Sequence, residues 1–233
     1  MEPNRDVPSI GAALSALARL TLVRLLRGKL LWVSVAIAFL PIALAKAVAA
    51  QPDTALTTTF GIELFVLAIL PPLFAAPAIG EELEDRTATY LWSRPLPRWS
   101  ILAGKLLALA PFVMAILVGS WLASIAFALH TAPPPLTIVA LAAGTLAVSV
   151  VSAGIATLAP KRGMAFAIIY ILIIDLSLGA IPASIQWLSV THATRVLAGF
   201  ESDQSPVSGA IAMAVISALW LAVAFRRIGR IET

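Results

Sequence analysis

The chain contains no cysteine, so it can form no disulfide, no thiolate metal site and no cysteine nucleophile. Charge is also scarce, because only 12% of the residues are Asp, Glu, Lys or Arg, against about 25% in average soluble domains. The phosphate-binding motif G-x-x-x-x-G-K-[ST] is missing, since Gly28-Lys29 and Gly104-Lys105 are each followed by leucine. We therefore expect that this chain is not itself an enzyme and that it binds no metal and no cofactor.

Hydrophobic residues make up 60% of the sequence, and the mean hydropathy is +0.97. Six apolar runs are long enough to cross a bilayer. They cover residues 30–50, 60–79, 106–129, 136–159, 165–184 and 207–225. No low-complexity linker divides the chain. The sequence therefore predicts an all-α, polytopic integral membrane protein with six transmembrane helices in a single domain, residues 1–233.

Basic residues gather on one side of this predicted topology. Six spans place both termini on the same side, and that side receives every Lys and Arg except Lys46 and Arg195. Cytoplasmic segments of membrane proteins carry such an excess, so we expect the N- and C-termini to be cytoplasmic. The pI near 10.0 follows from this distribution. It therefore gives no reason to expect a nucleic-acid partner.

Two segments outside the spans have a mixed composition. Residues 10–29 predict a helix with Arg24 and Arg27 on one face. It either lies in the cytoplasmic membrane interface, in contact with lipid, or extends the first span. Residues 185–206 mix apolar and charged side chains on the outer side. We expect a partly embedded, re-entrant segment there.

The longest predicted cytoplasmic loop, residues 80–105, is the most highly charged part of the chain. A helix is predicted from Glu81 to Ser93, ended by Pro95 and Pro97, and the next helix is expected to start near Arg98 or Ser100. Acidic residues contribute little to topology. The four acids at the start of the loop therefore predict a protein partner in the cytosol: Glu81, Glu82, Glu84 and Asp85.

This loop resembles that of the permease subunits of ATP-binding cassette (ABC) type-2 exporters. The family pattern has an acidic start, a threonine, an apolar turn, a proline, a basic residue and a Gly-Lys pair. The matching positions are Glu81, Glu82, Glu84, Thr87, Leu91, Pro95, Arg98, Gly104 and Lys105. The chain departs from the pattern at Arg86 and Ala88. The interfacial helix, six spans and outer re-entrant segment are also similar to that family.

The resemblance implies a function. In the family, the cytoplasmic loop forms a coupling helix that binds a separate nucleotide-binding ATPase, which holds ATP and Mg. The implied coupling residues are Glu81, Glu82, Glu84, Asp85, Thr87, Leu91, Pro95, Arg98 and Lys105. A second permease chain, most simply a second copy, would complete an exporter in a prokaryotic plasma (inner) membrane. The scarcity of charge inside the spans favours an apolar or amphipathic cargo.

Two other functions are compatible with parts of the sequence. Residues 81–86 match E-E-x-x-x-R, the first motif of membrane-embedded CAAX-type proteases. That chemistry also needs histidines near the glutamates, whereas His130 and His192 are predicted on the opposite side of the membrane. The third function is an ATP-independent channel or scaffold.

Polar residues within or beside the spans are further candidates. Asp175 lies midway along the fifth span, where it either belongs to a transport pathway or joins two helices by hydrogen bonds. Glu63 is expected to be solvated near the outer surface. His130 and His192 lack partners at metal-ligand spacing and are expected in surface or interface roles. Prolines are predicted to kink the second span at positions 71, 72 and 77.

Overall fold

The computed structural model describes residues 10–84 and 98–230. These residues form helices and no strand, and six of the helices are long and apolar enough to span a membrane. The expectation of an all-α, polytopic membrane protein is thus confirmed. Asp85, Thr87, Leu91 and Pro95, which the resemblance marks as coupling residues, lie outside the described residues.

Five α-helices of 18 to 33 residues lie between Ile10 and Leu158 in the part of the chain that the structure describes. They are α1 (Ile10–Arg27), α2 (Lys29–Val48), α3 (Pro52–Glu84), α5 (Arg98–Ser124) and α6 (Pro135–Leu158). A π-helical turn, Ile125–Leu129, extends α5. Such turns satisfy the backbone within the segment itself, as the interior of a bilayer requires.

The segment from Pro160 to Arg230 consists of shorter elements, apart from its last helix. Its elements are a 3-10 turn Pro160–Arg162, α7 (Gly163–Ile169), a π-helical turn Tyr170–Asp175, α8 (Leu176–Ala180), a 3-10 turn Ser184–Leu188, α9 (Val190–Leu197) and α10 (Pro206–Arg230). The fifth span therefore runs from Pro160 to Ala180. It was predicted to reach residue 184. It stops earlier because Ile181, which precedes Pro182, adopts an extended conformation.

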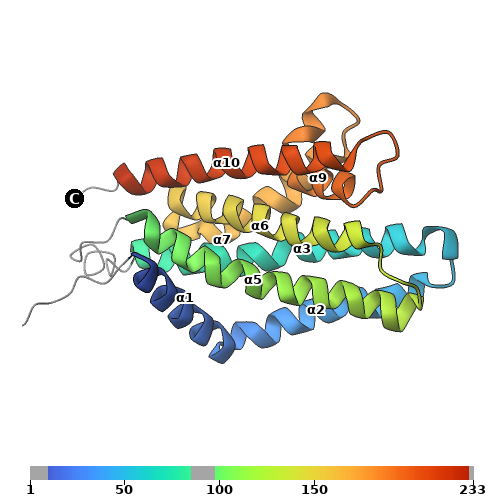
Figure 1. The fold of residues 1–233 in the computed structure, drawn as a ribbon, viewed down its shortest axis with the longest axis horizontal. Helices are drawn as coiled ribbons and strands as arrows, with labels where there is room; N and C mark the ends of the chain where they lie inside the picture. The colour runs from blue at the N-terminus through green and yellow to red at the C-terminus, as the bar shows by residue number, and fades with distance from the viewer. Residues whose placement is uncertain (1–9, 85–97, 231–233) are drawn as a thin grey trace, which may run out of the picture.

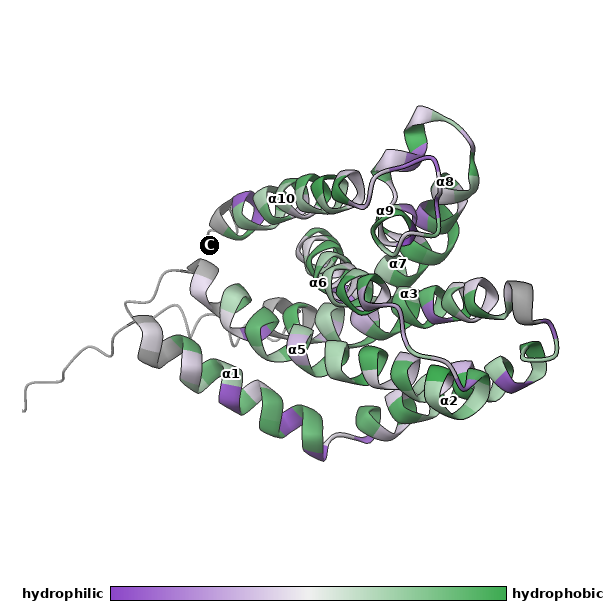
Figure 2. Ribbon diagram, turned by 45° about the vertical axis from the view of Figure 1, so that its right-hand side comes forward, coloured by the Kyte–Doolittle hydropathy of each residue, from purple (hydrophilic) through white to green (hydrophobic). Residues whose placement is uncertain are grey.

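Helices α3 and α6 form the centre of the bundle (Figure 1). In an apolar 18-residue stretch of each of these helices 67% of the residues are buried, against 22% in the corresponding stretches of α2, the fifth span and α10. Helices α2 and α5 cover one side of this centre, and α7 and α10 cover the other (Figure 1). The spans are largely hydrophobic along their length (Figure 2). Many of their large hydrophobic side chains are exposed, such as Phe39, Phe65 and Leu219, as expected of surfaces that contact lipid.

The bundle has two distinct ends. Helix α1 begins, α3 ends, α5 begins and α10 ends at one of them, which we call the basic end (Figure 1). The opposite end, which we call the α9 end, holds the α2–α3 connection and α9. The first and last described residues thus lie at the same end, as an even number of spans requires.

Helix α3 corrects the predicted start of the coupling helix. The second span was predicted to end at Ile79, with a new helix beginning at Glu81. Instead α3 is continuous from Pro52 to Glu84, with Pro71, Pro72 and Pro77 inside it. The three glutamates at its end therefore belong to its C-terminal turn rather than to a helix N-terminus. Neighbouring helices make the prolines tolerable in such a long helix.

Candidate functional site

Lys105 joins the two helices that lead into and out of the charged loop. It lies in α5, is 6% exposed, and its Nζ donates a hydrogen bond to the backbone carbonyl of Ala78 in α3. Arg98, one of the two expected starts, is the first residue of α5. The contact at Lys105 therefore holds α3 and α5 together at the base of the loop.

Gly104, the neighbour of Lys105, lies where α1 crosses α5. A Cβ atom added at Gly104 would lie 3.2 Å from Leu17 Cβ and 3.5 Å from the carbonyl oxygen of Leu14. Such contacts are tight, so glycine allows the two helices to approach closely. Gly104 thus contacts α1, and Lys105 contacts α3.

A cavity of ≈ 400 Å³ lies between α1, α2, α3 and α5 at the basic end. Its wall contains apolar side chains such as Leu17, Leu25 and Phe74. Its polar lining includes cationic residues from three helices: Arg24, Lys29 and Lys105. Apolar walls next to cations suit an anionic amphiphile, such as the headgroup and upper chain of an acidic lipid.

The glutamates and histidines of the protease motif lie at opposite ends of the bundle. Glu81 and Glu82 are in the last turn of α3, at the basic end. His130 follows the π-helical turn at the α9 end, and His192 lies in α9. The span between them is about 40 Å long, from 1.5 Å per residue over Thr54–Ile79. These groups therefore do not form one catalytic site.

Asp175 joins the fifth span to α9. It is 2% exposed, and its carboxylate accepts hydrogen bonds from the backbone N–H groups of Val190 (2.7 Å) and Thr191 (3.0 Å). The hydroxyl groups of Thr191 (2.7 Å) and Ser189 (3.1 Å) also donate to it. An anion is stabilised at a helix N-terminus by free N–H groups and the helix dipole. Of the two roles considered for Asp175, this geometry fits the joining of helices.

Helix α9 is buried among the spans. Ser189 caps it by accepting a hydrogen bond from the backbone N–H of His192 (3.0 Å). Glycines from two spans lie close to it: a Cβ atom at Gly209 of α10 would be 2.6 Å from the carbonyl oxygen of Ala193. At Gly144 of α6 a Cβ atom would lie 2.7 Å from Thr194 Oγ1. The region predicted to be partly embedded thus contains a helix packed on α6 and α10.

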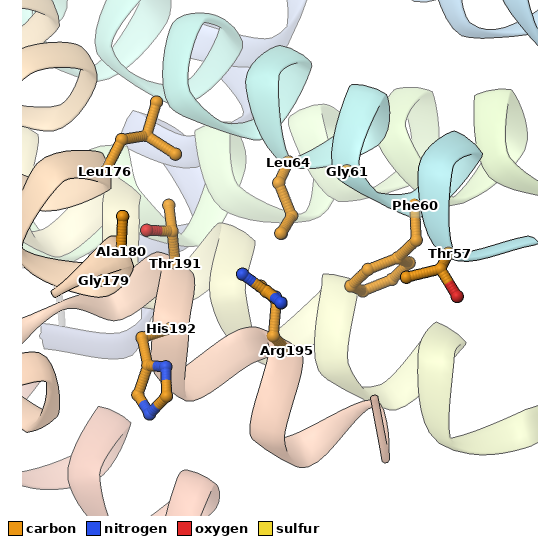
Figure 3. Close-up of a pocket in the computed structure, with 10 residues that line it drawn as sticks. All are labelled: Thr57, Phe60, Gly61, Leu64, Leu176, Gly179, Ala180, Thr191, His192 and Arg195. Carbon is orange, nitrogen blue, oxygen red and sulfur yellow. The ribbon is translucent and has the colours of Figure 1, made fainter. Parts of the chain in front are cut away.

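A second cavity, of ≈ 350 Å³, lies between α3, α8 and α9 (Figure 3). Arg195 extends from α9 toward α3 in this cavity and forms an ion pair with Glu201 (2.8 Å). Its walls also include Phe60 and Leu64 of α3. The single cationic residue in its lining is thus already paired with an acid.

His192 also lines this cavity but is not a surface residue. It is 3% exposed, and its Nε2 lies 3.3 Å from the side-chain oxygen of Gln204. Burial lowers its pKa, against smaller opposing effects from Gln204 and Glu201. His130, in contrast, is exposed and adopts a positive φ of 53°. Both positions fit the expected surface or interface roles, because His130 lies at the surface and His192 lies at an interface between helices.

Glu63 was expected to be solvated, and this expectation is wrong. The residue is fully buried (0% exposed). Since α3 begins at Pro52, Glu63 lies about 17 Å along the helix, at 1.5 Å per residue. Its Oε2 lies 3.3 Å from Ser120 Oγ of α5, and its Oε1 has no hydrogen-bond partner.

No protein-family model and no curated protein matches this chain. The resemblance to ABC permeases therefore continues to depend on the residues of the 80–105 loop and on the predicted arrangement of helices around it.

Proposed function

We propose that this chain is the membrane-spanning permease subunit of an ABC exporter, driven by a separate nucleotide-binding ATPase. The main support is the contact of Lys105 with Ala78, which joins α3 and α5 at the base of the loop that resembles the family's coupling helix. A loop held in this way transmits an imposed displacement to both helices together.

The packing around this contact suggests how a displacement would spread. Helix α3 is one of the two most buried spans, so its movement affects the centre of the bundle. Helix α5 contacts α1 at Gly104, so α1 would move with it. The coupling movement would thus reach α1, α3 and α5 first.

The proposed assembly has two permease chains and two ATPase chains, with ATP and Mg bound by the ATPase. The basic end would face the cytoplasm of a prokaryotic cell, in keeping with the usual excess of Lys and Arg on that side. The cargo would be apolar or amphipathic. The apolar cavity with cationic residues at the basic end is compatible with such a molecule.

Co-expression with candidate ABC ATPase chains tests the proposal. We expect one of them to co-purify with this chain and to show vanadate-sensitive ATP hydrolysis. Glu82→Lys should weaken the complex by about tenfold, since like charges would then meet at the interface. Asp203→Lys is the matched control, because it makes the same charge change at an exposed residue of the α9 end.

Two results would contradict the proposal. If no ATPase co-purifies, a channel or scaffold becomes the better description. If both charge reversals weaken the complex equally, the loop is not the binding surface.

Lys105→Met tests the transmission step separately from binding. The variant keeps most of the apolar stem of the side chain but cannot donate to Ala78. We expect the ATPase to bind as in the wild type, while this chain no longer stimulates its ATP hydrolysis. Lys161→Met is the control, since Lys161 is an exposed lysine at the same end. Full stimulation by Lys105→Met would show that the contact has no part in coupling.

A further inference from the structure

Glu63 lies in the membrane-spanning part of α3, where it faces α2 and α5. Among the described residues, no cation forms an ion pair with it. Helix α6 has no ionisable side chain, and Lys46 of α2 is exposed. Lys105 of α5 contacts Ala78, and Arg195 of α9 is paired with Glu201. A carboxylate in this position would thus be buried without a compensating charge, which is costly.

The hydrogen bonds around Ser120 indicate how this cost is avoided. Its hydroxyl lies 2.7 Å from the carbonyl oxygen of Ala38 in α2 and 3.3 Å from Glu63 Oε2. A hydroxyl has one hydrogen to donate and two lone pairs that accept. The shorter contact takes the hydrogen of Ser120, because the carbonyl of Ala38 can only accept. The contact with Glu63 is then a hydrogen bond only if Glu63 supplies the hydrogen.

We propose that Glu63 is a proton-binding site within the membrane. The bound proton completes a chain of hydrogen bonds in which Glu63 donates to Ser120 and Ser120 donates to Ala38, so that α3, α5 and α2 are joined. Release of the proton leaves a carboxylate next to Ser120. The hydroxyl then turns to the carboxylate and no longer donates to Ala38.

Helix α2 can respond to this change because its hydrogen-bond ladder is interrupted nearby. Pro41 lies inside α2, less than one turn beyond Ala38, and contributes no N–H group. Loss of the contact with Ser120 would therefore act on a part of α2 that is already weakened. The site does not depend on the proposed exporter function, and its test needs no ATPase.

Infrared spectroscopy of the full-length chain in lipid vesicles tests this proposal. At neutral pH we expect the carboxylic C=O stretching band of a protonated side chain in the wild type, shifted in heavy water and lost in Glu63→Gln. The band should disappear reversibly at alkaline pH. Glu201→Gln is the control, and the band should remain in it, because Glu201 is a partly exposed acid outside the spans.

Variants of serine test the hydrogen-bond chain itself. Ser120→Ala removes the acceptor of the Glu63 proton, so the band should shift. Ser149→Ala is the matched control, since Ser149 is also buried in a span and its hydroxyl has no partner. It should leave the band in place. An unchanged band in Ser120→Ala would overturn the chain of hydrogen bonds.

Two further results would overturn the proposal. In the first, Glu63→Gln at neutral pH removes a carboxylate band from the wild-type spectrum instead of a carboxylic acid band, so that Glu63 is ionised in the wild type. The second is loss of the carboxylic band when sodium or potassium replaces choline in the buffer, which would identify a metal-cation site instead. If Glu63→Gln does not fold, isotope-labelled glutamate in the wild type and in Ser120→Ala provides the same assignment.

Discussion

Asp175 and Glu63 are both carboxylic residues buried among the membrane-spanning helices, yet their surroundings differ. The carboxylate of Asp175 accepts four hydrogen bonds from the start of α9 and from two hydroxyl groups. Among the described residues, the carboxyl group of Glu63 has one hydrogen-bond contact, with Ser120, and its other oxygen has no hydrogen-bond partner. Burial of an acid therefore does not by itself indicate its role, because the nearby hydrogen-bond donors decide whether the charged form is stabilised.

The backbone explains this difference. Asp175 faces the N-terminus of α9, where N–H groups have no partner within the helix. Glu63 meets α5 at Ser120, where the chain continues into the π-helical turn, and Ser120 meets α2 near its middle, at Ala38. In both places the backbone N–H groups are largely used within the helices. Only a side chain can form a hydrogen bond with Glu63 there, and among the described residues Ser120 provides it.

Removal of the Asp175 carboxylate should have the largest effect. Asp175→Ala leaves the N–H groups of Val190 and Thr191 and two hydroxyls without their acceptor. We expect a loss of about 3 kcal/mol in the free energy of unfolding, since buried groups lose charged hydrogen bonds. Unfolding in mixed detergent micelles measures it. Asp203→Ala, at an exposed acid, is the control, and equal stability of the two variants would remove the contrast with Glu63.

Gly209→Ala tests whether packing, as well as Asp175, holds α9 in place. The new methyl group would lie 2.6 Å from the carbonyl oxygen of Ala193 and 2.8 Å from the backbone nitrogen of Leu197. Backbone atoms cannot move aside easily, so we expect a loss of about 2 kcal/mol. Gly61→Ala is the control, because nothing lies within 4 Å of its added Cβ. Equal unfolding curves would mean that α10 can shift at little cost.

Ser189→Ala should have an intermediate effect. It removes the cap of α9 and one of the four hydrogen bonds to Asp175. A lost helix cap costs about 1 kcal/mol. In the Asp175→Ala background the cost should be smaller, since the bond to Asp175 is already gone. A double-mutant cycle measures this coupling, and strictly additive losses would show that the two residues act independently.

Glu63→Gln should have the smallest effect on stability. Gln has the same shape as a protonated Glu and can donate an N–H to Ser120 in its place. We expect a change within about 0.5 kcal/mol in the same unfolding measurement. A loss as large as that of Asp175→Ala would show that Glu63 also joins helices through its charge, and the comparison between the two acids would fail.

Several residues show what sequence patterns indicate well and what they do not. Ser189 begins a Ser/Thr-rich stretch after Pro182, a pattern typical of a helix N-cap, so α9 could have been located more closely. The partner of Asp175 could not have been predicted, because neither the depth of Asp175 in the bundle nor the direction of its side chain follows from composition. Glu63 was misplaced because the start of α3 at Pro52, rather than near Phe60, moved it deeper into the bundle.

The sequence alone determined the six spans, the helix before them and the common side of the two termini. These features are local, since a lipid bilayer forces each apolar segment to satisfy its own backbone as a helix. Only the tertiary structure decided which polar side chains meet. Glu63 meets Ser120 and Asp175 meets α9 because of how the helices are rotated and crossed. Packing between residues far apart in the chain sets those rotations, and no local pattern encodes them.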